Sequence, residues 1–128
     1  MGELTEGINL LAVMVGTVLS FILGWLWYSP LLFVKKWMEG INVKPDPDAK
    51  IPVGPLVAQL IGTFLLAWLV GIAAAHNALA TIVLIVVTII VLTIANGMFA
   101  SKSNNAIVIE AGFIGAMAVV MIAVQAIL

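Results

Sequence analysis

The chain has 128 residues, of which 64% are hydrophobic and 9% are charged, and its mean hydropathy is +1.28. A soluble domain is about 45–50% apolar and about 25% charged, so this composition excludes a soluble domain and indicates an integral membrane protein. The net charge of −1 shows no bias toward nucleic acid, and the lack of cysteine excludes disulfides and thiolate chemistry. At about 20 residues per membrane-spanning helix, residues 1–128 form a single domain with room for four spans.

The first predicted element is a membrane-spanning helix over residues 8–28. We expect it to be retained, because residues 1–7 carry two glutamates and none of the basic residues that open a secretory signal peptide. Small residues recur at every fourth position and form one groove that another helix can approach closely. They are Ala12, Gly16, Ser20 and Gly24. Such a groove is more typical of packing inside one molecule than of a dedicated subunit interface.

This helix is expected to end at the membrane–water interface. Pro30 cannot continue the helical hydrogen bonds and disfavours a helical residue before it, so the chain should break at Ser29-Pro30. A short interfacial helix over residues 31–39 follows, capped by Gly40, and then a proline-rich loop over residues 40–54. Aromatic and basic side chains typical of the headgroup layer anchor this region. The anchors are Trp25, Trp27, Lys35, Lys36 and Trp37.

Three further spans are predicted over residues 55–75, 78–100 and 106–128. The second span carries a groove of small residues formed by Ala67, Gly71 and Ala75, which should pack on the first groove. The third is rich in β-branched residues, yet its length and unbroken apolarity favour a span over a strand. The fold class is therefore an all-α membrane protein with four transmembrane helices and one short interfacial helix.

Orientation is predicted from the lysines, which all lie in the first and third connections. They are Lys35, Lys36, Lys44, Lys50 and Lys102. The termini and the second connection have no Lys or Arg. By the positive-inside rule, the lysine-bearing loops are cytoplasmic and both termini lie outside, across a bacterial or archaeal cytoplasmic membrane.

Glu110 is the one acidic or basic residue well inside a predicted span. Asn96 and Glu110 lie seven residues to either side of Ser103, so antiparallel helices should bring them to similar depth. Gln59 and Tyr28 belong to the same inner layer, which predicts one polar side chain from each helix. Two readings stay open for this layer. It is either a polar clamp that fixes helix register, or a cation or proton site in which Glu110 titrates.

The chain resembles domain-of-unknown-function family 1761, a family of small bacterial four-helix membrane proteins. The resemblance rests on the run Gly24 to Pro30, which contains Trp-Tyr-Ser-Pro, with Phe33 and Trp37. It extends to Asn96 with Phe99, and to Ala111-Gly112-Phe113. The family position matching Glu110 is more often an amide, so the resemblance supports the polar pairing with Asn96 more than a titrating role. It implies membrane location and fold, and it supplies no catalytic residues.

The sequence indicates no enzyme, cofactor or metal site, since it has no catalytic triad, phosphate loop, metal-ligand cluster or paired intramembrane carboxylates. Two classes of function remain. The first is a small oligomeric channel or transporter with a polar site at Glu110, and the second is a non-catalytic accessory or scaffold subunit. The expected partners are the lipid bilayer and either further copies of the chain or other membrane subunits.

Overall fold

The computed structural model describes residues 2–29, 32–43 and 53–128, and these residues form six helices and no strand. The helices are α1 (Gly2–Thr5), α2 (Leu10–Trp27), α3 (Val34–Gly40), α4 (Val53–Ala75), α5 (Leu79–Phe99) and α6 (Asn104–Ile127). Four of them, α2, α4, α5 and α6, are long and apolar enough to cross a membrane. The predicted all-α membrane fold with four spans is thus confirmed.

The four long helices begin and end within two residues of the predicted bounds. The short helix differs more, because α3 begins at Val34 and includes Gly40, which was expected to cap it. Helix α1 was not predicted, and it is tied to α4 by the indole Nε1 of Trp68, which donates to the carbonyl oxygen of Leu4 at 2.6 Å. Of the predicted loop over residues 40–54, positions 44–52 lie outside the described residues, and α4 already begins at Val53.

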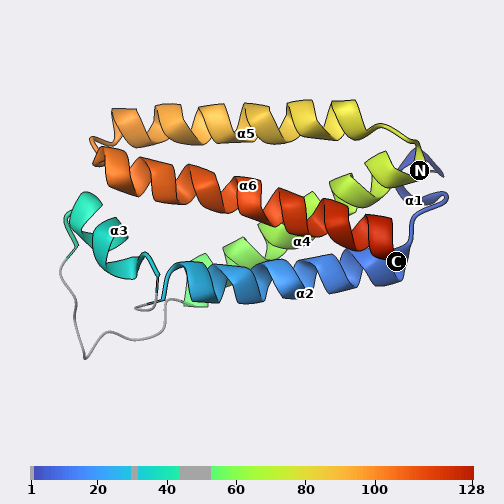
Figure 1. The fold of residues 1–128 in the computed structure, drawn as a ribbon, viewed down its shortest axis with the longest axis horizontal. Coiled ribbons are helices and arrows are strands. Elements are labelled where there is room, and N and C mark those ends of the chain that lie inside the picture. The colour runs from blue at the N-terminus through green and yellow to red at the C-terminus, as the bar shows by residue number, and fades with distance from the viewer. Residues whose placement is uncertain (1, 30–31, 44–52) are drawn as a thin grey trace.

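The long helices form an antiparallel bundle in which α6 packs against α2, α4 and α5 (Figure 1). Both termini and α1 lie at one end of the bundle, together with the turn between α4 and α5. Helix α3 and the turn between α5 and α6 lie at the opposite end. Two lysine-bearing segments that are distant in the sequence, α3 and the α5–α6 turn, therefore share one end of the molecule.

Three helices end in the same way, although none of them uses glycine for the purpose. Asn42, Asn77 and Ser101 each take positive φ, at 59°, 53° and 59°. After α4, the N–H of Ala78 donates to the carbonyl oxygen of Ala73 at 2.8 Å, and the other two turns repeat this pattern. These are Schellman turns, which satisfy the last carbonyl groups of a helix and reverse the chain sharply.

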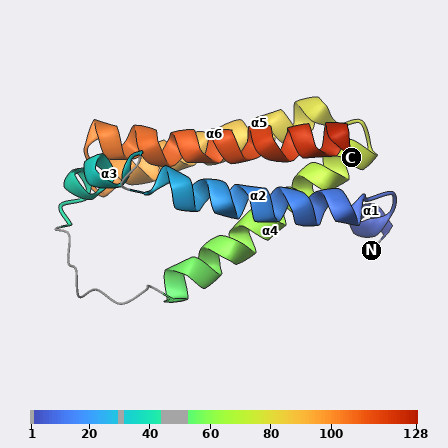
Figure 2. The same ribbon diagram turned by 60° about the horizontal axis from the view of Figure 1, so that its bottom comes forward.

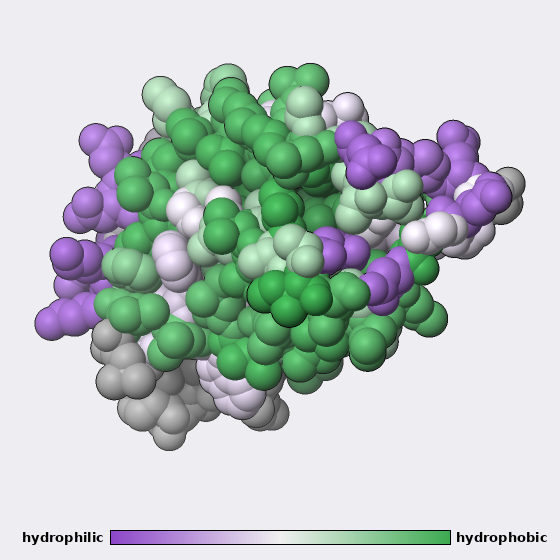
Figure 3. All heavy atoms as spheres, turned by 45° about the vertical axis from the view of Figure 1, so that its right-hand side comes forward, coloured by the Kyte–Doolittle hydropathy of each residue, from purple (hydrophilic) through white to green (hydrophobic). Residues whose placement is uncertain are grey.

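The buried core is apolar except for the hydroxyls of Thr17, Ser20 and Thr63, and many other apolar side chains face outward. Val13, Ala67 and Met121 are almost fully buried where α2, α4 and α6 meet. On α5, by contrast, Leu84 and Leu92 are 66% and 57% exposed. In Figure 3 hydrophobic residues cover the middle of the visible face, and hydrophilic residues gather at its left and right edges. That distribution suits a bilayer, which solvates the apolar belt between two polar ends.

Helix α4 is the least parallel member of the bundle. It crosses α2 obliquely, and its first half diverges from α5 and α6 at the end that carries α3 (Figure 2). Every residue from Val53 to Gly62 is exposed. A Cβ placed on Gly54 or Gly62 would meet no atom of another described segment within 4 Å, so the backbone of this half of α4 is open at these two positions.

Candidate functional site

Glu110 lies in the second turn of α6, and both of its carboxylate oxygens have partners. The ammonium Nζ of Lys102 lies 3.0 Å from Oε1 and 2.9 Å from Oε2. The indole Nε1 of Trp37 donates to Oε2 at 2.9 Å. The Glu110 side chain is 17% exposed and that of Lys102 is 30% exposed, so the pair lies at the edge of the bundle. The cation and the N–H donor together satisfy both oxygens of this partly buried carboxylate.

The turn before α6 places Lys102 for this contact. Ser101 takes positive φ, which ends α5 and sends the chain back along it. Ser103 then starts α6 as its N-cap, with its Oγ accepting from the N–H of Ala106 at 3.1 Å. Lys102 thus precedes α6 by two residues, and its long side chain extends along the first turns of α6 to reach Glu110.

Helix α3 reaches the same carboxylate because it docks on the start of α6. The N–H of Ser103 donates to the carbonyl oxygen of Gly40 at 3.0 Å. Gly40 is buried, and a Cβ at this position would come within 2.5 Å of the Cβ of Ala106 and still closer to the Ser103 hydroxyl. The two backbones touch here because Gly40 has no side chain. Gly40 was predicted to cap α3, but its role is this close approach, and Asn42 supplies the positive φ instead.

An aromatic cluster packs beside the Glu110 contact. Tyr28 meets the ring of Trp37 edge to face, with centroids 5.1 Å apart, and the ring of Phe113 at 5.6 Å. Trp27 contacts Phe33 at 4.9 Å and Phe113 at 6.1 Å. Such tilted and edge-to-face pairs are the favoured aromatic geometries. The cluster fastens the end of α2, the segment after it and α3 onto α6.

Tyr28 follows the last residue of the first span, and its phenol is held in the neutral form. Burial raises the pKa of Tyr28 from 10.0 to about 12, and the nearby negative charge of Glu110 adds to the rise. Both causes disfavour the tyrosinate anion. Tyr28 therefore stays protonated at physiological pH and cannot act as a base for Glu110.

The predicted four-residue polar layer forms only in part. Tyr28 does lie near Glu110, but Asn96 and Gln59 are both exposed and do not contact it. Within the described residues, the Gln59 amide bonds only to the Thr63 hydroxyl of its own helix, at 3.3 Å. Lys102 and Trp37 take the positions that the amides were expected to fill.

The errors have separate geometric causes. The face of α5 that packs on α6 carries Gly97, where an added Cβ would lie 2.7 Å from Cγ1 of Ile107. Successive helical residues are about 100° apart, so Asn96 at the same depth points away from α6. Gln59 lies in the divergent half of α4 and so never reaches the layer. Equal depth alone does not bring two side chains together.

The small-residue grooves of α2 and α4 were expected to pack on one another, and the structure places them differently. Ala12, Gly16 and Ser20 are buried, and a Cβ on Gly24 would lie 2.8 Å from Cζ of Phe113. The groove of α2 therefore lies largely against α6. On α4, Ala67 and Gly71 are buried, with Val13 against Gly71, whereas Ala75 is exposed.

The expected interface anchors divide into two groups. Trp25 is 79% exposed, and Lys35 and Lys36 are exposed on α3, so these three are free to reach headgroups. Trp27 instead donates its indole Nε1 to the carbonyl oxygen of Ile109 at 3.0 Å, and Trp37 donates to Glu110. Because their N–H groups are used internally, these two tryptophans hold the fold together. Spacing in the sequence does not separate these two tryptophans from Trp25, because their indole bonds depend on how α2 and α3 pack on α6.

Four apolar helices, with one ion-paired carboxylate at one end among the described residues, define this chain as a small polytopic membrane protein. It belongs to the family described as protein of unknown function (DUF1761), whose model matches residues 11–126. This match confirms the family identified from the sequence. No curated protein and no solved structure matches the chain.

Proposed function

We propose that this protein is a non-catalytic accessory or scaffold subunit of a membrane complex, in which Glu110 acts as a structural clamp. The observation that supports this proposal is the Glu110 contact set. One carboxylate joins the α5–α6 turn through Lys102 and joins α3 through Trp37. A carboxylate whose two oxygens are both engaged by the protein holds elements together, and a free cation could bind it only in place of Lys102.

The surroundings of Glu110 also favour the clamp over a proton or cation relay. Farther along α6, every buried residue is apolar, the largest being Phe113, Met117 and Met121. The buried polar side chains of the other described spans are the hydroxyls of Thr17, Ser20 and Thr63. Thr17 and Thr63 donate to carbonyl oxygens of their own helices, and Ser20 has no hydrogen-bond partner among the described residues. Ions and protons need a continuous series of polar groups or water along their path. Hydroxyls bonded within their own helices do not make one, so the described residues of a single copy offer no relay beyond Glu110.

The proposed partner is another membrane-spanning subunit or a second copy of the chain. The exposed first half of α4, from Val53 to Gly62, is the surface we assign to it. Gly54 and Gly62 leave the backbone open to a close approach. Membrane helices associate through such small residues, and a neighbouring polar group such as Gln59 adds interhelical hydrogen bonds.

A second candidate function is an oligomeric channel or transporter, and one observation favours it. Asn96 and Gln59 are exposed near the α3 end, and Asn96 has no side-chain hydrogen bond within the described residues. Amides on the outside of one copy would line a polar path only between copies. We place the α3 end in the cytoplasm in either case, and both termini outside a bacterial or archaeal cytoplasmic membrane.

A flux measurement on the purified protein separates these candidates. In proteoliposomes, the accessory proposal predicts no cation or proton flux above empty liposomes from pH 5 to 8. It also predicts that Glu110→Gln changes nothing in that assay. A flux that wild type supports and that Asn96→Leu or Gln59→Leu abolishes would overturn the accessory proposal and favour the oligomeric path. A flux that only Glu110→Gln abolishes would show that the clamp reading of the site is wrong.

A further inference from the structure

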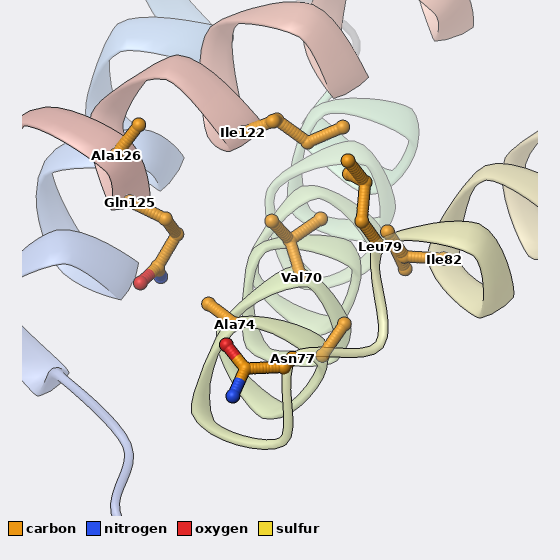
Figure 4. A pocket seen from close by; sticks show the side chains of 9 residues that line it. Val70, Ala74, Asn77, Leu79, Ile82, Ile122, Gln125 and Ala126 are labelled. Atoms are coloured by element: carbon orange, nitrogen blue, oxygen red, sulfur yellow. The ribbon is translucent and has the colours of Figure 1, made fainter.

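A cavity of about 270 Å³ lies at the opposite end of the bundle from Glu110, among α4, α5 and α6. Its walls come from the last turns of α4, the α4–α5 turn, the first turn of α5 and the last turns of α6 (Figure 4). For comparison, a cavity of about 150 Å³ holds benzene, and pockets for drug-sized ligands begin at about 300 Å³. The space therefore suits one ring or one segment of chain rather than a large folded ligand.

The lining has an apolar side and an amide side. In Figure 4, Ile122, Leu79 and Ile82 lie on one side of Val70, and the amide groups of Asn77 and Gln125 end on the other. Among the residues that the structure describes, no acidic, basic or histidine side chain lines the cavity. Such a site matches a neutral amphiphile, with an apolar body and one uncharged group that accepts a hydrogen bond.

The amide of Gln125 is placed for such a contact and is not otherwise used. Its Nε2 lies over Gly71, where an added Cβ would come within 3.3 Å, so the missing side chain makes room for the amide. Gln125 is half-buried, and neither it nor Asn77 has a side-chain hydrogen-bond partner within the described residues. An unpaired amide near the end of a membrane helix costs free energy unless a lipid, water or protein group pairs with it.

We propose that this cavity binds an ester lipid of the surrounding bilayer, taking one acyl-chain segment against its apolar side and an ester carbonyl at Gln125. The depth agrees with this occupant. Gln125 lines the same cavity as Asn77, which lies in the turn where α4 ends and α5 begins, and at the end of a span a bilayer changes from acyl chain to ester groups. The uncharged lining agrees as well, because the ester carries no charge while accepting N–H donors.

The test uses two probes that differ only in the proposed acceptor. We would add 1-decanoylglycerol, which has an ester carbonyl, or 1-decylglycerol ether, which lacks it, to the purified protein in mild detergent. Native mass spectrometry would measure the bound fraction. The ester is expected to bind about threefold to tenfold more tightly than the ether, the range that one net hydrogen bond provides. Equal binding of the two probes would overturn the proposal.

Variants tie the result to this cavity. Gln125→Leu should reduce ester binding to the level of the ether, and Ala74→Phe should exclude both probes by filling the space beside the amide. Gln59→Leu is the matched control, because Gln59 is an exposed amide at the other end of the bundle and should leave ester selectivity unchanged. Circular dichroism would verify that each variant folds. Unchanged selectivity in Gln125→Leu, or unchanged binding in Ala74→Phe, would show that the lipid binds elsewhere.

Discussion

Tyr28 is the only tyrosine in the chain, so its ionisation can be followed directly by ultraviolet absorbance. We expect a titration midpoint of about 12 for the folded protein. Glu110→Gln should lower this midpoint, because it removes the negative charge that adds to the effect of burial. Glu39→Gln is the control, since Glu39 is exposed on α3 and is not a cause of the shift. A midpoint near 10 in the folded wild type would contradict the buried placement of the phenol.

The same shift has a consequence for stability at alkaline pH. The pKa of Tyr28 is higher in the folded than in the unfolded protein, so the unfolded protein loses its proton first. The contribution of Tyr28 to the free energy of unfolding is thus complete below pH 10 and falls as the pH rises from 10 to about 12. The free energy of unfolding, measured in denaturing detergent, should be lower at pH 11 than at pH 9. Tyr28→Phe should lack this part of the difference, because phenylalanine has no proton to lose.

Glu110 itself is tested by two substitutions of different chemistry. Glu110→Gln keeps an acceptor for the Trp37 indole and removes only a partly exposed ion pair, so we expect a loss of less than about 1 kcal/mol. Glu110→Leu leaves the Trp37 N–H and the Lys102 ammonium without their acceptor, which should cost about 1–3 kcal/mol. Free energies of unfolding would measure both. If both variants were as stable as wild type, the carboxylate would not hold these elements together.

At the scale of the elements, the docking of α3 depends on one glycine. Gly40→Ala would force a Cβ to within 2.5 Å of that of Ala106, so α3 should detach or shift. We expect faster proteolysis between α3 and α4 and a change in tryptophan fluorescence. Gly54→Ala is the matched control, because that position has no neighbour within 4 Å and the change should stabilise α4 by up to about 1 kcal/mol. Identical proteolysis of both variants would contradict the docking.

A second pair of glycines tests helix packing on α4. Gly71→Leu would drive a branched side chain into Val13 of α2, where even a Cβ comes within 2.7 Å. Gly62→Leu lies nine residues earlier on the same helix and meets nothing within 4 Å. The midpoint temperature of thermal unfolding in detergent should be lowered by Gly71→Leu and not by Gly62→Leu. If Gly62→Leu instead disrupts an oligomer while leaving the monomer stable, the proposed partner surface on α4 gains support.

The elements were largely predictable from the sequence, while their rotations and tilts were not. Hydropathy sets where a span begins and ends, so all four long helices were located closely. The contacts of Glu110 depend on which face α5 turns to α6 and on the angle at which α4 crosses α2, and both follow from packing between helices. Gly97 allows α5 to approach α6 closely, and Gly40 does the same for α3 and α6. A lone glycine in a sequence does not show which residue it will contact.

For the whole molecule, the orientation is the prediction to test first. A reporter fused after Leu128 should be extracytoplasmic, and one inserted between Val43 and Val53 should be cytoplasmic, because Lys35, Lys36 and Lys102 lie at the α3 end of the bundle and the remaining two lysines lie between these two valines in the sequence. The bundle already places both termini at one end and α3 at the other (Figure 1). Two reporters on the same side would contradict the four-span fold, and a reversed pair would contradict only the orientation.

The divergence of α4 gives the molecule a wedge-shaped outline, wider at the α3 end than at the end with the termini (Figure 2). A wedge displaces more lipid from one leaflet than from the other. The surrounding monolayers relieve that imbalance by bending, so the protein should concentrate where the membrane is already curved in the matching sense. For the orientation that the lysines predict, with the α3 end in the cytoplasm, that is where the cytoplasmic leaflet is the more expanded of the two.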